Sequence, residues 1–259
     1  MFHEFYRGME LHPRLLGVDV KQLTNCRMGM IMWQLLILIY FGASYQLKGF
    51  DPGHLVNVTL QTLYIYKFYR WETGYFNTLD ITLDRAGYYL CWGCLVWVPS
   101  LYTFHSYFFV YHQPQSSIAS ALVIFSLGIA MIYFNYDVDR QKELFSTGRP
   151  IKMWGKKAEG LKVTYTTSTG DKKTRQLLVS GWWGLARKIN YSFELGAALA
   201  WSIPAGFNYG IWPFIYFLFL LVLLIHRIFR DEEKCKNKYG NGWVQYCKKV
   251  PYRLIPHVF

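Results

Sequence analysis

Two stretches of the chain combine cations with flat aromatic side chains beside long apolar segments. LLVSGWWGLARKINY covers residues 177–191, and HRIFRDEEKCKNKYGNGWVQYCKKVPYRLIPHVF covers residues 226–259. Aromatic faces and cations placed together can seat a flat ring and a phosphate group. The same composition suits a juxtamembrane anchor, in which Trp and Tyr lie at headgroup level and Lys and Arg lie in the cytosol. Composition alone leaves both interpretations open.

Long apolar segments must position these two stretches. A helix that crosses a bilayer needs about 20 predominantly apolar residues. Asn57, Gln61 and Lys67 interrupt one such segment, and polar residues in a spanning helix usually face the bundle interior. Pro99 should kink or break another. The sequence predicts an all-α polytopic transmembrane bundle of about six spans, over residues 28–47, 54–69, 86–111, 118–136, 193–207 and 209–228.

Most of the Lys and Arg residues lie from residue 137 onward. Residues 137–180 form the main loop, in which β-branched residues around Thr169-Gly170-Asp171 predict a β-hairpin. We expect a short interfacial helix over residues 181–191 and an amphipathic helix or turn over residues 229–249. The positive-inside rule places the loop and the 229–259 tail in the cytosol. We expect a single membrane-embedded domain over residues 1–259.

The composition narrows the class of protein. The chain has 259 residues, 53% of them hydrophobic and 19% aromatic, and a net charge of +12. Its basic residues alternate with apolar blocks too long for a nucleic-acid domain, so we expect a lipid bilayer rather than nucleic acid as its partner. Cys91 and Cys94 form a CxxC inside an apolar run without a second pair, which indicates packing and no metal site.

The order of the residues resembles the sterol reductase family, polytopic membrane enzymes that reduce carbon–carbon double bonds of sterols with NADPH. The two stretches described above resemble two signatures of that family. GMELHPRLLGVDVKQLTNCRMGMIMW, at residues 8–33, also follows the family pattern. YYLCWGCLVWVPSLYTFHSYFFVYH and DRQKELFSTGRPIKMWGKK, at residues 88–112 and 139–157, look most like the 7-dehydrocholesterol reductase branch. The resemblance covers nearly the whole chain, which begins inside the family pattern, so we expect it to be N-terminally short.

The resemblance implies a site for NADPH between membrane helices at the cytosolic face. The sequence has no GxGxxG after a strand, so no Rossmann fingerprint is visible. Lys142 and Lys238 suit phosphates, with Arg187 as a further cation, while Asn190 and Asp231 suit hydroxyl and amide groups. An interfacial anchor stays open as the alternative for each residue. The positions that match the family's nucleotide contacts are Lys142, Leu178, Trp183, Asn190, Tyr191, Asp231, Cys235, Lys236, Asn237, Lys238, Tyr239 and Tyr246. Arg227 lies one helical turn before Asp231 and should share its face.

Reduction of a sterol double bond by hydride also needs an acid. A donor that stays protonated in an apolar pocket is a Tyr or a carboxyl group of raised pKa. Tyr64 and Glu72 match a pocket tyrosine and glutamate of the family, and their spacing of eight predicts one face of a helix. We expect Tyr64 to be the proton donor and Glu72 its orienting partner. The alternative is an aromatic belt residue and a solvated helix end.

The sequence departs from the family pattern at three positions. Lys67 and Cys94 stand where relatives usually carry Asp, and Ser146 stands where an Arg for the cofactor phosphate is expected. These departures put catalytic competence and the preference for NADPH over NADH in question. The neighbouring cations that could replace the missing Arg are Arg140, Arg149 and Lys152.

The resulting hypothesis is an NADPH-dependent sterol reductase of the endoplasmic reticulum membrane. Its expected substrate is the 7,8 double bond of a 7-dehydrocholesterol-type sterol, and other enzymes of sterol biosynthesis are candidate partners. One alternative is reduction of the 14,15 double bond. A second alternative, favoured by the three departures, is a non-catalytic sterol-binding or scaffold protein, as in the lamin B receptor branch.

Overall fold

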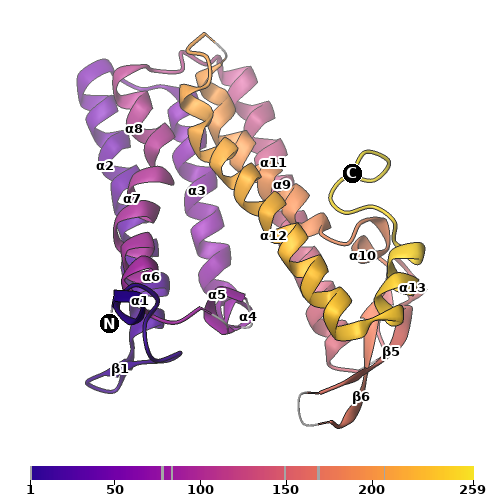
Figure 1. Cartoon of the computed structure of the whole chain (residues 1–259). Helices are drawn as coiled ribbons and strands as arrows, with labels where there is room; N and C mark the ends of the chain where they lie inside the picture. Colours follow the sequence, from indigo (N-terminus) through magenta and orange to yellow (C-terminus); the bar gives the residue numbers. More distant parts are fainter. Residues whose placement is uncertain (1, 77–78, 83, 149, 168–169, 207) are drawn as a thin grey trace. The chain divides into compact units, whose positions relative to one another are not determined.

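The computed structural model describes residues 2–76, 79–82, 84–148, 150–167, 170–206 and 208–259. The fold is mostly helical, with short antiparallel strand pairs (Figure 1). Within the described residues, three helical stretches are long and apolar enough to cross a membrane, and these are Gln22–Lys48, Ile118–Ser146 and Trp212–Tyr239. The chain divides into two compact units, the first made of Met1–Ile129 and Ala198–Phe217, the second of Ala130–Ala197 and Leu218–Phe259.

The first unit is built from the N-terminal half of the chain and one returning segment. Its π-helical and 3-10 segments are named η. Its elements are α1 (Phe2–Arg7), β1 (Arg14–Leu15), β2 (Val18–Asp19), η1 (Gln22–Gly29), α2 (Met30–Lys48), α3 (Pro52–Arg70), α4 (Glu72–Tyr75), α5 (Leu79–Thr82), α6 (Tyr88–Trp92), η2 (Gly93–Trp97), α7 (Val98–Leu101), α8 (Phe104–Tyr111), η3 (Ile203–Ala205) and η4 (Trp212–Phe214).

Helices α2, α3 and α8 pack against one another in this unit (Figure 1). α3 begins where the side chain of Asp51 accepts a 2.9 Å hydrogen bond from the backbone N–H of His54, and Pro52 occupies its first turn. A short polar cap followed by proline is a strong helix start. The predicted spans at residues 28–47 and 54–69 are therefore helices.

The predicted span at residues 86–111 is broken rather than continuous. It consists of α6, η2, α7 and α8, and the break between α7 and α8 follows Pro99 by a few residues. Proline removes one helical hydrogen bond and crowds the preceding turn. The side-chain hydroxyl of Thr103 donates to the carbonyl of Pro99, which satisfies an acceptor at the break. The expected effect of Pro99 is confirmed.

Two of the three polar side chains singled out in the span at 54–69 point into the first unit as predicted, whereas Lys67 is only partly buried. Asn57 and Gln61 are fully buried. Gln61 accepts a 2.8 Å hydrogen bond from the indole of Trp33 and donates to Asn57 and Ser106 at 2.9 and 3.0 Å. Asn57 donates to the backbone carbonyl of Trp201 at 2.6 Å. This network joins α2, α3 and α8 to the returning segment through satisfied buried groups.

The second unit contains the hairpins and the C-terminal helices. Its elements are most of α9 (Ile118–Ser146), β3 (Lys152–Met153), β4 (Lys156–Lys157), β5 (Gly160–Thr166), β6 (Lys172–Leu178), α10 (Trp182–Leu185), most of α11 (Ile189–Ser202), most of α12 (Ile215–Tyr239) and α13 (Asn241–Lys249). α9 and α12 extend the predicted spans at residues 118–136 and 209–228 into the polar regions that follow. The predicted span at 193–207 corresponds to α11 and η3, with residue 207 outside the described residues.

The predicted β-hairpin is confirmed. β5 and β6 pair antiparallel from Gly160 opposite Leu178 to Thr166 opposite Lys172. Residue 169 of the predicted turn lies outside the described residues. α13 approaches β5 so closely that a Cβ atom at Gly242 would lie 2.9 Å from the side chain of Val163. Glycine at this position therefore allows the C-terminal helix to pack on the hairpin.

Three predicted boundaries in this unit are wrong. The first residues of the predicted loop, 137–146, belong to α9. The predicted interfacial helix at 181–191 is interrupted, because Ala186 is extended with φ −151° and ψ 149° and separates α10 from α11. The predicted separate helix at 229–249 is instead the end of α12 followed by α13, and Gly240 with φ +51° marks the turn between them.

Candidate functional site

A buried tryptophan anchors the candidate nucleotide site in the second unit. The indole N–H of Trp183 donates to the carbonyl of Val138 at 2.9 Å. Trp183 belongs to an apolar cluster with Val138 and Leu178, which is itself one of the predicted contact residues. The ammonium of Lys142, on α9, lies 4.3 Å from the centroid of the Trp183 ring. This placement brings together a flat face and a cation from segments some 40 residues apart.

The turn before α10 fixes this arrangement. Gly181 has φ +62°, and a Cβ atom there would lie 2.3 Å from the side-chain oxygen of Gln141. That oxygen accepts from the backbone N–H of Trp182 at 3.2 Å. The indole of Trp182 donates to Asp137 at 2.9 Å. The turn is thus held against α9 by Gln141. Any residue larger than glycine at position 181 would displace the Gln141 side chain.

An ion pair links the same region to α12. The ammonium of Lys188 donates to the Asp231 carboxylate, and both side chains are largely buried. Burial on its own lowers the pKa of Lys188. The charge and hydrogen bond of the Asp231 carboxylate, together with Tyr191 and Cys235, outweigh that effect and raise the pKa above its usual value. Three predicted contact residues, Tyr191, Asp231 and Cys235, therefore surround one lysine.

Arg187, which was predicted to supply a cation for the cofactor phosphate, bonds to other parts of the protein. Its guanidinium donates to Glu232 at 2.6 and 3.1 Å and to the carbonyls of Val250 and Pro251 at 2.7 and 2.8 Å. Arg253 donates to the other oxygen of Glu232 at 2.9 Å. Arg187 is 6% exposed, so its donors hold the tail in place. Its expected use as a cation for the phosphate stays a prediction, and here its donors are taken up by Glu232 and the two carbonyls.

Asn190 offers an unused acceptor next to this network. Its backbone carbonyl accepts a 2.9 Å hydrogen bond from Asn135. Its side-chain oxygen is buried and finds no donor among the described residues. A buried polar atom without a partner is costly unless a ligand or a water satisfies it. This atom fits the predicted contact with a hydroxyl or amide group of a bound nucleotide.

The remaining predicted contacts lie toward the end of α12 and on α13. Lys236, Asn237 and Lys238 are exposed, whereas Tyr239 and Tyr246 are buried. The ammonium of Lys238 lies 4.5 Å from the ring centroid of Tyr165 on β5. Burial raises the pKa of Tyr246. Arg227 and Asp231 both lie within α12, one turn apart, as expected.

The predicted proton donor lies in an aromatic environment of the first unit. The ring centroid of Tyr64, on α3, is 5.8 Å from that of Trp33 and 5.5 Å from that of Trp201. The ammonium of Lys67 lies 5.2 Å from the Tyr64 ring. Two aromatic rings and one ammonium group therefore surround the Tyr64 ring.

Glu72 does not share a helical face with Tyr64. α3 ends at Arg70, Trp71 leaves the helical region with φ −124°, and Glu72 begins the separate helix α4. The Glu72 carboxylate accepts two hydrogen bonds from the guanidinium of Arg27, at 2.7 and 3.0 Å. The prediction of one continuous helical face is wrong because a helix break intervenes. The role of Glu72 as an orienting partner stays a prediction.

The positions that depart from the family pattern have identifiable surroundings. Cys94 is buried, and its thiol donates to the side-chain oxygen of Asn25. The Ser146 hydroxyl donates to the carbonyl of Glu143 at 2.7 Å at the end of α9. Arg140 and Lys152 are exposed, and residue 149 lies outside the described residues.

Sequence reasoning missed several residues of these clusters. Lys188 lies within the stretch 177–191, but no role was predicted for it. Its position beside Asn190 and Tyr191, two predicted contact residues, could have identified it as a cation of the site. Arg27 and Tyr165 are distant in sequence from the residues they contact, so spacing could not reveal them. Among the described residues, no group of three or more His, Cys, Asp or Glu side chains could hold a metal ion.

Comparisons with known proteins agree with the resemblance. The chain is 44% identical to the 7-dehydrocholesterol reductase of Arabidopsis thaliana and 36% identical to that of Xenopus laevis, over 99% and 100% of this chain and 60% and 55% of those proteins. It is 34% identical to the Delta(14)-sterol reductase of Methylotuvimicrobium alcaliphilum, over 100% of this chain and 58% of that protein. The chain thus spans little more than half the length of these relatives. The model of the ergosterol biosynthesis ERG4/ERG24 family matches residues 1–259, and the chain belongs to this family.

Proposed function

We propose that the chain forms the reducing part of a membrane sterol reductase that uses NADPH. Its substrate is the 7,8 double bond of a 7-dehydrocholesterol-type sterol. Two relatives named 7-dehydrocholesterol reductase, 44% and 36% identical over nearly the whole chain, support this choice of reaction. Reduction of the 14,15 bond is the second candidate, because relatives named Delta(14)-sterol reductase are 34% and 38% identical.

The observation that carries the cofactor proposal is the clustering of three separate segments in the second unit. Lys142 from α9, Trp183 from α10 and the Lys188–Asp231 pair provide a cation, a flat face and a polar anchor. The buried side-chain oxygen of Asn190 fits a donor of the ligand. These groups suit phosphates, a ring and an amide, and when bound NADPH supplies hydride to the sterol.

The proton is proposed to come from Tyr64. Protonation of the far carbon of the 7,8 bond in a 5,7-diene leaves an allylic cation, which hydride then quenches. Trp33 and Trp201 flank the Tyr64 ring and offer π-faces that stabilise a cation. Lys67, whose ammonium lies near the same ring, stabilises the phenolate that remains after proton transfer.

The proposed membrane topology has six spans in one membrane-embedded domain of the endoplasmic reticulum. The three apolar helices, together with α3, the α6–α8 segment and α11, account for the six crossings. The second unit carries 20 of the 28 Lys and Arg residues of the chain. The positive-inside rule therefore places the hairpin loop and the tail together in the cytosol.

Sterol profiling tests this function. The chain is expressed in a host that lacks its own sterol reductases, and the accumulated sterols are identified by mass spectrometry. Loss of the 7,8 double bond supports the proposal, and loss of the 14,15 bond selects the second candidate. An unchanged profile from a folded, membrane-inserted chain that still binds sterol would make a non-catalytic sterol-binding protein the better account.

A further inference from the structure

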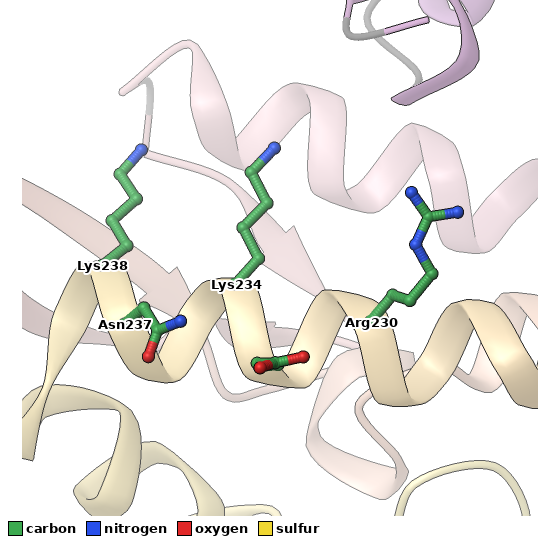
Figure 2. Close-up of a pocket in the computed structure, with 5 residues that line it drawn as sticks. Arg230, Lys234, Asn237 and Lys238 are labelled. Atoms are coloured by element: carbon green, nitrogen blue, oxygen red, sulfur yellow. The ribbon is translucent and has the colours of Figure 1, made fainter.

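The exposed side of α12 carries a stripe of cations. Arg230, Lys234 and Lys238 are spaced four residues apart, which places them on one face of the helix. All three are exposed, and Figure 2 shows their side chains extending from the same side of α12. With Glu233 and Asn237 they line an open groove of about 540 Å³. We call these three cations the basic stripe.

The charge of the basic stripe is not neutralised by its neighbours on the helix. Asp231 and Glu232 are occupied by Lys188 and Arg187. Within the part of the chain that the structure describes, Arg230 and Lys234 make no ion pair. The groove is lined by three cations and one carboxylate, so its lining has a net positive charge.

The basic stripe begins where a membrane span ends. Arg230 follows Trp212 by 18 residues, which corresponds to roughly 27 Å along an α-helix, about the thickness of the hydrocarbon core. Lys234 and Lys238 lie roughly 6 and 12 Å farther along the axis. If the Trp212 end lies at one edge of the hydrocarbon, Arg230 and Lys234 lie among the headgroups at the other.

We propose that the basic stripe binds the headgroup of an anionic glycerophospholipid in the cytosolic leaflet. Arg230 and Lys234 at headgroup depth complement a phosphodiester and a carboxylate, Lys238 adds positive charge farther out, and lysines and arginines next to a span attract anionic lipids. The lining of the groove includes no aromatic side chain among the described residues. Around Arg230 and Lys234 the groove therefore offers no flat face to a nucleotide ring, and a lipid headgroup does not require one. The aromatic rings of Tyr165 and Tyr239 lie next to Lys238, at the other end of the stripe.

The test measures lipid binding to the purified full chain in detergent micelles. Bound dioleoylphosphatidylserine and dioleoylphosphatidylcholine are counted by native mass spectrometry for wild type and for Arg230→Gln/Lys234→Gln. The matched control is Lys248→Gln/Lys249→Gln, which removes two exposed charges from α13. We expect wild type to prefer phosphatidylserine, and each removed cation of the stripe to weaken that binding roughly fivefold. The control and the charge-conserving Arg230→Lys/Lys234→Arg variant should stay within about twofold of wild type.

Equal phosphatidylserine binding by wild type and the stripe variant would overturn the proposal, as would an equal loss in the control. An NADPH arm separates the lipid from the cofactor. If NADPH displaces phosphatidylserine and the stripe variant loses NADPH affinity to the same degree, the stripe belongs to the nucleotide site and the lipid proposal fails. Should the double variant not fold, Lys234→Gln alone gives the same readout, with about a fivefold loss expected.

Discussion

The guanidinium of Arg187 lies 2.6 Å from the carboxylate of Glu232, across 45 positions of sequence. This pair joins the segment before α11 to α12, and Arg253 completes it from the tail. A buried charge that loses its partner is left uncompensated. The integrity of the second unit therefore depends on this contact more than on the exposed charges nearby.

Replacement of Glu232 tests that dependence. Glu232→Gln should lower the free energy of unfolding by roughly 3–5 kcal/mol, because it leaves the Arg187 guanidinium buried without its anion. Thermal unfolding of the purified protein in detergent measures the change. Glu233→Gln, at an exposed neighbour on the same helix, is the control and should shift stability little. Equal losses of stability in the two variants would show that the Arg187–Glu232–Arg253 network does not stabilise the unit more than an exposed charge does.

Nucleotide titration tests the placement of the cofactor site. Lys142→Ala and Asp231→Ala should each weaken NADPH binding by about tenfold or more, since a charge-assisted bond contributes roughly 1.5–3 kcal/mol. Selectivity over NADH should be modest, because Ser146 replaces an expected Arg. Lys248→Ala serves as the control. If both site variants bind NADPH like wild type, the placement is wrong, and if wild type binds neither nucleotide, the reductase proposal fails.

Substitution of the predicted acid should separate turnover from binding. Tyr64→Phe keeps the ring between Trp33 and Trp201 but removes the proton. Turnover should fall on the order of 100- to 10,000-fold, while sterol affinity changes little. Tyr66→Phe, at an exposed position of the same helix, should retain activity. Unchanged turnover in Tyr64→Phe would exclude Tyr64, and Glu72 would become the next candidate.

The Lys188–Asp231 pair predicts a pH dependence of stability. The pKa of Lys188 is raised in the folded state, so its stabilising contribution is complete below the unfolded value of 10.5 and is lost as the pH rises through the higher folded value. The stability difference between wild type and Lys188→Met should therefore stay constant from neutral pH to about pH 10 and shrink above it. Unfolding measured at a series of pH values checks this, and a difference that disappears below pH 9 contradicts it.

Cysteine labelling tests the topology. Single cysteines at the exposed positions Lys172 and Lys248 should react with an impermeant maleimide only from the cytosolic side of sealed vesicles. A cysteine in place of Gly210, an exposed residue of the turn that the structure places between η3 and η4, should react only from the lumenal side. Lumenal labelling of residue 172 or 248 would refute the six-span arrangement.

The sequence predicted the fold where local pattern and packing agree. Apolar length identified α2, α9 and α12, and alternation identified the β5–β6 hairpin. The sequence did not reveal that α3 stops before Glu72, and spacing could not indicate its partner Arg27, which lies 45 positions away in the chain. The resemblance predicted that Asp231 lies near the stretch 177–191. It did not predict that Asp231 pairs with Lys188, because that contact depends on tertiary packing. Arg187 is the clearest example of what the sequence could not predict. Its residue type suits a phosphate, but in the structure its buried guanidinium pairs with Glu232.

The backbone contacts of the tail have a consequence for biosynthesis. The backbone N–H groups of Arg187 and Lys188 donate to the carbonyls of Tyr252 and Arg253 at 2.9 and 2.8 Å. During translation the earlier segments emerge first, and residues 252–253 emerge only after all of α9 to α13. Until then the guanidinium of Arg187 lacks the carbonyls of residues 250 and 251 as well as the flanking Arg253. The second unit can therefore complete its assembly only after these residues leave the ribosome, and its hairpin and α12 must wait for the tail without these contacts.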